Sequence, residues 1–222
     1  ITGVYGTTFT FASEFVATRV AMALCLETEI ETADLLRKLK GVGPAGVMRG
    51  VLFEAYAARK IAAGGLFCVK EIGSSEETKL DLPLTTLLQK DTKTLNKTHY
   101  PPNQIKDKLV WPNPEYNMPA IDMFMLLLQT CIALQMTVAH SHRLDLNGTK
   151  AFLKYFDSVC RELFPRQGVP KDYSLYFAVP PDIYDSFSNA EQPITGPHGV
   201  TLHTQESTNV GARAKQWIMK IE

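Results

Sequence analysis

The sequence has 222 residues, 45% of them hydrophobic and 21% charged, which is typical of a globular protein with a substantial core and excludes a disordered or fibrous chain. Basic and acidic residues are equal at 23 each, so the net charge gives no support for nucleic-acid binding, although a local basic patch is compatible with it. No apolar run reaches the roughly 18 residues that a membrane span needs, so we expect no membrane association. The four cysteines form no Cys-x-x-Cys pair, which argues against structural zinc and favours reduced, buried thiols.

The first 65 residues are predicted to be mainly helical. Residues 13–40 carry apolar side chains at helical spacing and are expected to form one or two amphipathic helices. A glycine-containing turn, "KGVGPAGVMRG", follows, and a second helix is expected from residue 47 until the Gly64-Gly65 pair ends it. We place a boundary after residue 45, which separates an N-terminal helical segment (1–45) from a larger domain (46–222).

The rest of the chain is predicted to consist of strands and one further helix. Strands are expected at 66–72, around 83–89, twice within 117–142, at 173–180 and, as a short last strand, at 214–222. Residues 147–164 have one apolar side and predict an amphipathic helix. A mixed set of strands with helices on both sides predicts a three-layer α/β sandwich. The sequence lacks a glycine loop of the kind that binds nucleotide phosphates, so it does not indicate nucleotide hydrolysis.

Three polar residues interrupt apolar elements and are the candidates for a functional site. Glu54 lies in the predicted helix "GVLFEAYAA", and Asp122 follows "MPAI" at the first of two paired strands. Gln135 lies in the return strand "IALQMTV", with Thr137 two positions later on the same strand face. Mg²⁺ prefers oxygen ligands and keeps several waters, so an Asp, a Gln and a Glu from a packed helix suit it. A metal at this place would activate a water and neutralise charge on a phosphoryl group.

Simpler explanations exist for the same three residues. Asp122, close to Pro119, is compatible with a turn or bulge residue that bonds local backbone N–H groups. Gln135 is compatible with a solvated position in an amphipathic strand, and Glu54 with an exposed helical stripe. Spacing alone does not choose between these roles and a metal site.

Five segments of the sequence resemble a known family. They are "GVLFEAYA", "WPNPEYNMPAIDMF", "LQMTVAHSH", "LYFAVPPDIYDSF" and "QWIMKI", and they occur in that order from about residue 46 to the end. In this combination the sequence resembles the C-terminal nuclease-like region of Crinkler effectors and the related retrotransposon hot spot proteins. The resemblance implies a restriction-endonuclease-like fold, a virulence effector that is secreted into a host cell, and action on DNA in the host nucleus.

The resemblance also implies roles for single residues. Glu54 matches the helical Glu of the family, Asp122 the strand Asp, and Gln135 the Glu or Gln that begins the third motif, so these three are the expected catalytic and Mg²⁺-binding residues. Thr137 departs from the pattern, because the family has a Lys at that position and a hydroxyl cannot supply the positive charge that stabilises a pentacoordinate phosphate. Another base would then be needed, and the candidates are two histidines of the "TVAHSH" segment and a lysine of the 66–72 strand: His140, His142 and Lys70.

A second segment, "LLRKLKGVGPAGVMRG", resembles a helix-hairpin-helix. In that arrangement a Gly-x-Gly turn presents backbone N–H groups and a helix N-terminus to a DNA phosphate. The expected DNA-binding residues are the glycines of the turn and the basic side chains near it: Lys38, Lys40, Gly41, Gly43 and Arg49. The alternative is an ordinary glycine turn that joins two helices.

The leading hypothesis is therefore a Crinkler-like effector domain that is a Mg²⁺-dependent DNA endonuclease or a DNA-binding nuclease-like module. The alternative is a catalytically inactive module of the same fold that binds a host or partner protein, which the Thr at position 137 and the neutral net charge favour. A third possibility is a structural part of a longer protein whose enzyme activity lies upstream. The chain opens at Ile1 without a signal-peptide pattern, so we expect it to be a piece of such a longer protein.

Overall fold

The computed structural model describes residues 29–41, 46–89, 106–111, 121–127, 130–165, 173–196, 201, 211 and 213–222. Its contacts divide the chain into two compact units, Ile1–Ala58 and Arg59–Glu222. The division falls inside a helix, whereas the boundary placed from the sequence comes just before that helix. Residues 1–28, which include the first part of the predicted N-terminal helices and Cys25, lie outside the described residues, as does the centre of the predicted glycine turn with Gly43.

The first unit contains the helix α2 (Glu29–Lys38) and most of α3 (Gly46–Ala63). Asp34 and Lys38, one helical turn apart, form an ion pair at 2.6 Å. Basic residues occupy the last turn of α2, where their positive charge interacts favourably with the negative end of the helix dipole. The buried Arg49 joins the two helices, because its Nε donates to the Leu36 carbonyl at 3.3 Å. The structure thus confirms the helix predicted from residue 47 and a helix in the described part of the predicted 13–40 region.

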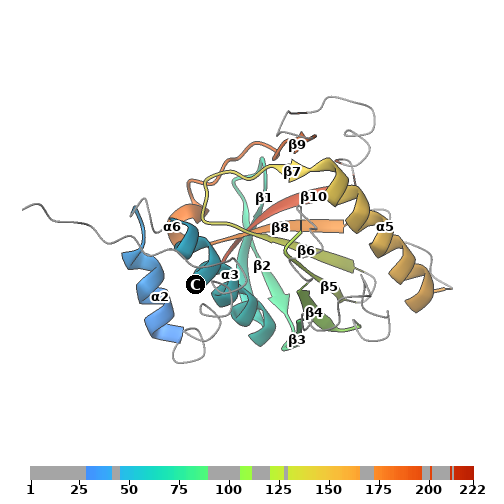
Figure 1. Cartoon of the computed structure of the whole chain (residues 1–222), viewed down its shortest axis with the longest axis horizontal. Coiled ribbons are helices and arrows are strands. Elements are labelled where there is room, and N and C mark those ends of the chain that lie inside the picture. The colour runs from blue at the N-terminus through green and yellow to red at the C-terminus, as the bar shows by residue number, and fades with distance from the viewer. Residues whose placement is uncertain are drawn as a thin grey trace, which may run out of the picture. The chain divides into compact units, whose positions relative to one another are not determined.

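The second unit is built around a mixed sheet with the strand order β2-β1-β10-β8-β6-β5-β4-β3 (Figure 1). The strands are β1 (Gly65–Glu71), β2 (Glu77–Leu82), β3 (Thr86–Gln89), β4 (Lys108–Trp111), β5 (Met123–Leu127), β6 (Thr130–Met136), β8 (Tyr173–Val179) and β10 (Ala214–Lys220). The three central strands β6, β8 and β10 are parallel, as is the β3–β4 pair, and the other neighbours are antiparallel. A separate parallel pair is formed by β7 (Leu144–Asp145) and β9 (Ile194–Thr195).

The helix α5 (Leu146–Leu163) connects β6 to β8 and covers one face of the sheet (Figure 1). It begins at Asp145, whose carboxylate accepts a hydrogen bond from the Gly148 backbone N–H at 2.6 Å, so the helix has a side-chain N-cap. Its apolar side is aromatic: Phe152 stacks on Phe156 at 6.2 Å and meets Tyr173 of β8 edge-on at 5.7 Å. A short helix, α6 (Pro181–Tyr184), follows β8 directly.

Most of the elements predicted from the sequence are present. The strands at 66–72 and 173–180, the paired strands within 117–142 and the helix at 147–164 are confirmed, and the strand near 83–89 is found as β3. The prediction for 214–222 understated β10, which is a seven-residue strand in the middle of the sheet. Sequence reasoning missed β2, β4, β7 and β9. A mixed α/β fold is therefore confirmed, and its restriction-endonuclease-like, three-layer form stays a prediction.

The described cysteines carry free thiols, as expected: Cys131 and Cys160 are buried and Cys68 is half-buried. Burial raises the pKa of the Cys131 thiol well above its usual value, and burial together with Asp157 raises that of Cys160 to about 11. Across the described ranges, no helix has the length and apolar character that a bilayer crossing requires.

Candidate functional site

Asp122 and Gln135, the two polar residues that interrupt the apolar strands, contact one another. Asp122 comes directly before β5, and its backbone N–H donates to the Leu134 carbonyl of β6 at 2.8 Å, which extends the strand pairing. Its Oδ2 accepts hydrogen bonds from Gln135 Nε2 at 2.7 Å and from the Met136 backbone N–H at 2.6 Å. Asp122 is half-buried and Gln135 is 5% exposed. A carboxylate is tolerated here because two donors of the neighbouring strand converge on it.

The other end of the Gln135 amide is less well satisfied. Its Oε1 is buried and has no hydrogen-bond partner among the described residues. A buried acceptor without a donor costs about 1–3 kcal/mol, so it needs a partner such as an ordered water, an ion or a ligand. Turning the amide would place Oε1 against Asp122 Oδ2 in place of Nε2, and two oxygens at such a distance are held together only by a cation or a proton.

The 2.7 Å contact between Gln135 Nε2 and Asp122 Oδ2 is a hydrogen bond, and an amide nitrogen is not a ligand that Mg²⁺ prefers. Only with the amide turned would the two side chains present two oxygens to one ion. Nowhere in the described ranges do three His, Cys, Asp or Glu side chains come together as a metal site. The pair therefore offers one carboxylate and one amide, and an ion held by so few protein ligands takes the rest of its shell from water and substrate phosphate.

Glu54, the third predicted ligand, lies on α3 and is half-buried. It belongs to the first unit, whereas Asp122 and Gln135 belong to the second. Its place in a common metal shell stays a prediction.

Thr137 follows β6 and has a local structural role. It is 9% exposed, and its backbone N–H donates to the Ala178 carbonyl at 3.0 Å, which continues the pairing with β8. Its hydroxyl oxygen accepts the Ala139 N–H at 3.1 Å and so shapes the turn after the strand. The side chain thus supports the end of β6, and it brings no positive charge to the position where the Crinkler-type proteins that the sequence resembles have a Lys.

His142 lies beside the row of the sheet that contains Gln135. Its ring centroid is 6.3 Å from that of Phe177, and Phe177 of β8 is the register partner of Gln135. Its backbone N–H donates to Gln192 Oε1 at 2.7 Å. Burial lowers the pKa of His142, so the imidazole is neutral near pH 7 and able to accept a proton. His140 is exposed, and its Nδ1 shares a hydrogen bond of 2.9 Å with Ser186 Oγ.

Lys70 does not take the place of the missing Lys. Gln135, Phe177, Ile218 and Lys70 are successive register partners across β6, β8, β10 and β1. Three strand spacings of ~4.8 Å therefore separate the backbones of Lys70 and Gln135, which is about 14 Å. The Lys70 ammonium instead lies 4.7 Å from the centre of the Tyr184 ring of α6.

Buried glutamines support the loop that carries His142, and sequence reasoning missed them. Gln192 and Gln216 are 3% and 8% exposed. Gln216 Oε1 accepts the Gln192 N–H at 2.8 Å, and Gln192 in turn accepts the His142 N–H. A Gln inside the apolar strand "AKQWIMK" was the available signal, of the same kind as Gln135.

The residues of the predicted DNA-binding turn differ in their exposure and in their contacts. Lys38 and Lys40 are exposed, and Lys38 is paired with Asp34. Gly41 has φ +74, a conformation that favours glycine, whereas the Arg49 side chain is buried between helices rather than displayed at a surface. The grip on a DNA phosphate stays a prediction.

Comparison with known proteins adds no relative: no family model, no curated protein and no solved structure matches the chain. A function for the domain therefore has to be argued from the site itself.

Proposed function

We propose that this domain is a metal-dependent, nuclease-like module of the Crinkler type that acts on phosphodiester bonds of DNA. The observation that carries the proposal is the part-buried contact between Asp122 and Gln135, with one amide oxygen left without a donor. The resemblance requires an Asp and a Gln from adjacent strands to act together, and their contact supports it. A restriction-endonuclease-like form of the fold is part of the same proposal.

The residues have distinct roles in this scheme. Asp122 and Gln135 would hold the Mg²⁺, and the resemblance implies the same role for Glu54. A bound divalent cation would activate a water and neutralise charge on the phosphoryl group. His142, kept neutral by burial, accepts the proton of the attacking water as the phosphorus–oxygen bond to the leaving strand breaks.

A cleavage assay with a matched control tests this proposal. Purified protein is incubated with plasmid and with single-stranded DNA in Mg²⁺, Mn²⁺ or EDTA, and Asp122→Asn is compared with Asp81→Asn, which changes an exposed Asp of β2 in the same way. The expected result is metal-dependent cutting that Asp122→Asn abolishes and Asp81→Asn retains. Folded wild type that cuts neither substrate, or cutting that Asp122→Asn leaves unchanged, would overturn the proposal.

A second candidate is a catalytically inactive module of the same fold that binds a host or partner protein. Two observations favour it: the Thr137 hydroxyl is used in a local turn, and Asp122 Oδ2 already accepts two hydrogen bonds, as a purely structural bracket would. Titration calorimetry with Mn²⁺ separates the two functions, because only a metal site gives binding heat that Asp122→Asn removes.

The resemblance also implies a site of action. We propose that the domain acts in a host nucleus after secretion by the organism that produces it. A fluorescent fusion expressed inside host cells tests this, since exclusion of the fusion from the nucleus would contradict it.

A further inference from the structure

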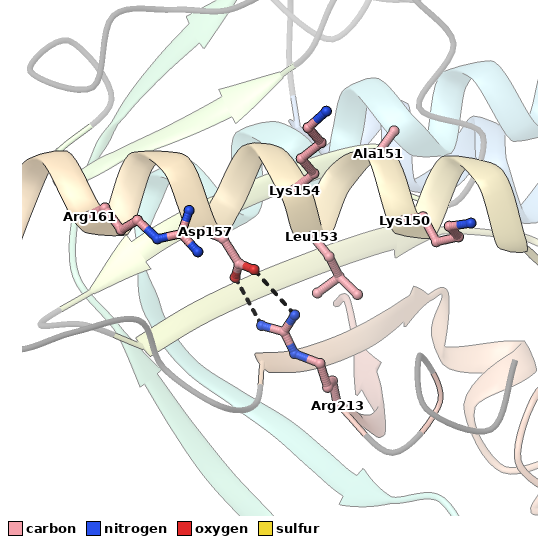
Figure 2. A pocket seen from close by; sticks show the side chains of 7 residues that line it. All are labelled: Lys150, Ala151, Leu153, Lys154, Asp157, Arg161 and Arg213. Atoms are coloured by element: carbon pink, nitrogen blue, oxygen red, sulfur yellow. Dashed lines mark hydrogen bonds and ion pairs between the residues drawn. The ribbon is translucent and has the colours of Figure 1, made fainter. Parts of the chain in front are cut away.

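The outer side of α5 carries a pocket of about 440 Å³ that the proposed chemistry does not use (Figure 2). Six of its lining residues come from α5 and one from the segment before β10: Lys150, Ala151, Leu153, Lys154, Asp157, Arg161 and Arg213. Figure 2 shows the Arg213 guanidinium reaching toward the helix, where its NH2 and NH1 nitrogens lie 2.9 Å and 3.4 Å from the two Asp157 carboxylate oxygens. An ion pair between Arg213 and Asp157 therefore forms part of the pocket lining.

The lining of this pocket is strongly basic. It contains four basic residues and one acidic residue, an excess of three positive charges, in a chain whose basic and acidic residues are equal in number. Asp157 is bound to Arg213, so it does not neutralise Lys154 or Arg161 directly. A concentration of one sign of charge around a hollow attracts a polyanion.

The basic residues of α5 also form a straight line. Lys150, Lys154 and Arg161 are exposed and separated by four and seven positions, which places them on one side of the helix, with the Arg213-bound Asp157 between Lys154 and Arg161. At 1.5 Å per residue this line is about 16 Å long. One strand of a duplex carries a phosphate about every 3.4 Å along the axis, so the line matches about five phosphates.

The line of basic residues begins near the end of the central strands at which the candidate site lies. β6 and β8 are parallel neighbours, so α5 between them runs back across the sheet, and its first turn lies at the edge where β6 ends. Gln135 is the next-to-last residue of β6, and the loop with His142 leads from that edge into α5. A strand lying along α5 is thereby led toward Asp122 and Gln135.

We propose that Lys150, Lys154, Arg161 and Arg213, here named the α5 stripe, bind the sugar-phosphate backbone of a nucleic acid. The inference rests on the proposed function and deepens it, because it names the surface that holds the substrate strand. The Arg161 guanidinium is suited to bind a phosphate through two parallel hydrogen bonds, whereas the Arg213 guanidinium is held by Asp157 and contributes its charge. Ala151 and Leu153 supply an apolar part of the lining for sugars or bases.

Binding is measured by fluorescence anisotropy with labelled single-stranded and duplex oligonucleotides, in EDTA so that cleavage does not interfere. Lys154→Glu and Arg161→Glu are compared with Lys106→Glu, which reverses an exposed charge away from α5. Each lost phosphate contact lowers affinity about tenfold near 50 mM salt and reduces the salt slope by about one. The expected result is such a loss in both α5 variants, for every sequence tested, with Lys106→Glu within twofold of wild type.

Several outcomes would overturn the inference. No binding by the wild type, or equal binding by Lys154→Glu and Lys106→Glu, removes the α5 stripe as a nucleic-acid surface. Competition by inorganic pyrophosphate as effective as by oligonucleotide, per phosphate, assigns the pocket to a small phosphate ligand instead. Equally effective competition by polyglutamate assigns it to an acidic protein.

The inference and the proposed function fail separately. Asp81→Asn, which changes neither the α5 stripe nor the candidate site, is expected to bind oligonucleotide normally in EDTA. If the wild type cuts DNA in a metal-dependent way and the α5 variants bind DNA normally, only the inference about the α5 stripe is wrong. If the α5 stripe binds DNA but no metal-dependent cutting occurs, only the proposed nuclease activity is wrong.

Discussion

Replacing Gln135 with Glu is the most direct test of the contact with Asp122. In the wild type, the amide Nε2 donates to Asp122 Oδ2 at 2.7 Å. The Gln135→Glu substitution replaces that donor with a second carboxylate oxygen and changes the size of the side chain very little. The two carboxylates must then repel one another, share a proton or bind a cation.

The size of the effect follows from the separation of the two groups. Two unit charges at this distance repel by about 6 kcal/mol at an effective dielectric constant of ~20. The folded protein avoids part of this by taking up a proton, which costs a carboxyl of ordinary pKa ~4.3 about 3.7 kcal/mol at pH 7 and about 1 kcal/mol at pH 5. The protein adopts whichever of the two, charge repulsion or proton uptake, costs less free energy, and here that is proton uptake. We therefore expect the variant to lose about 4 kcal/mol of unfolding free energy at pH 7 and about 1 kcal/mol at pH 5.

The measurement is urea unfolding in EDTA and in Mg²⁺ or Mn²⁺, followed by the fluorescence of the half-buried Trp217 in β10. A cation at one hundred times its dissociation constant returns about 2.7 kcal/mol to the variant. Gln135→Met is the control: it loses one hydrogen bond but also removes the amide oxygen without a donor, so we expect a change within about 1.5 kcal/mol that cations do not affect.

Two results would refute the reasoning. A loss below about 1 kcal/mol at pH 7 would mean that the side chains do not face one another, because two carboxylates in contact cost more free energy than that, whether they repel or take up a proton. A loss of the expected size that no divalent cation reverses would leave a hydrogen-bonded bracket between β5 and β6 in place of a metal site.

Three further predictions concern the second unit. Phe152→Ala removes a fully buried ring that packs edge-on against two other rings, and urea unfolding should show a loss of about 3–5 kcal/mol; less than 1 kcal/mol would mean that α5 is not part of the core. Gly64→Ala should cost about 1–3 kcal/mol more than Gly73→Ala in the same assay, because both have positive φ but only at Gly64 would the new Cβ lie 2.6 Å from the Leu84 backbone nitrogen; equal losses would contradict this. Burial lowers the pKa of His142 below its ordinary ~6.5, so its contribution is complete above that value and is lost as the pH falls, by at most about 1.4 kcal/mol per pH unit. Unfolding free energies measured from pH 7 downward should therefore fall less steeply for His142→Asn, and identical slopes would count against a buried imidazole.

The spacing of apolar residues along the sequence was enough to predict the elements that bury one side, or all, of their own residues in the core. The helical spacing of the apolar residues in α5 and the apolar residues that make up all of β8 except Ser174 both reflect burial against the same core, and each was visible in the sequence. Asp122 and Gln135 were visible for the same reason, since a polar side chain inside an apolar strand requires a partner.

The pairing of distant strands was not available from local pattern. β2, "ETKLDL", is an edge strand with charged residues at alternate positions, so it resembled a polar loop. The place of β10 between β1 and β8 depends on pairings far apart in the sequence, and only that register shows that Lys70 lies three strands from Gln135. The α5 stripe was hidden for a different reason: Arg213 joins it through a contact with Asp157, 56 positions earlier.

The central place of β10 has a consequence for how the chain folds. Val69 of β1 pairs with Met219, 150 positions later, and on its other side β10 pairs with β8. β10 is the last described strand to leave the ribosome, so until then the β1–β2 hairpin and the strands from β8 to β3 are two separate sheets, each with an open backbone edge. Such a late, long-range closure is slow, and the partly made protein would depend on chaperones to keep those edges from pairing with other chains.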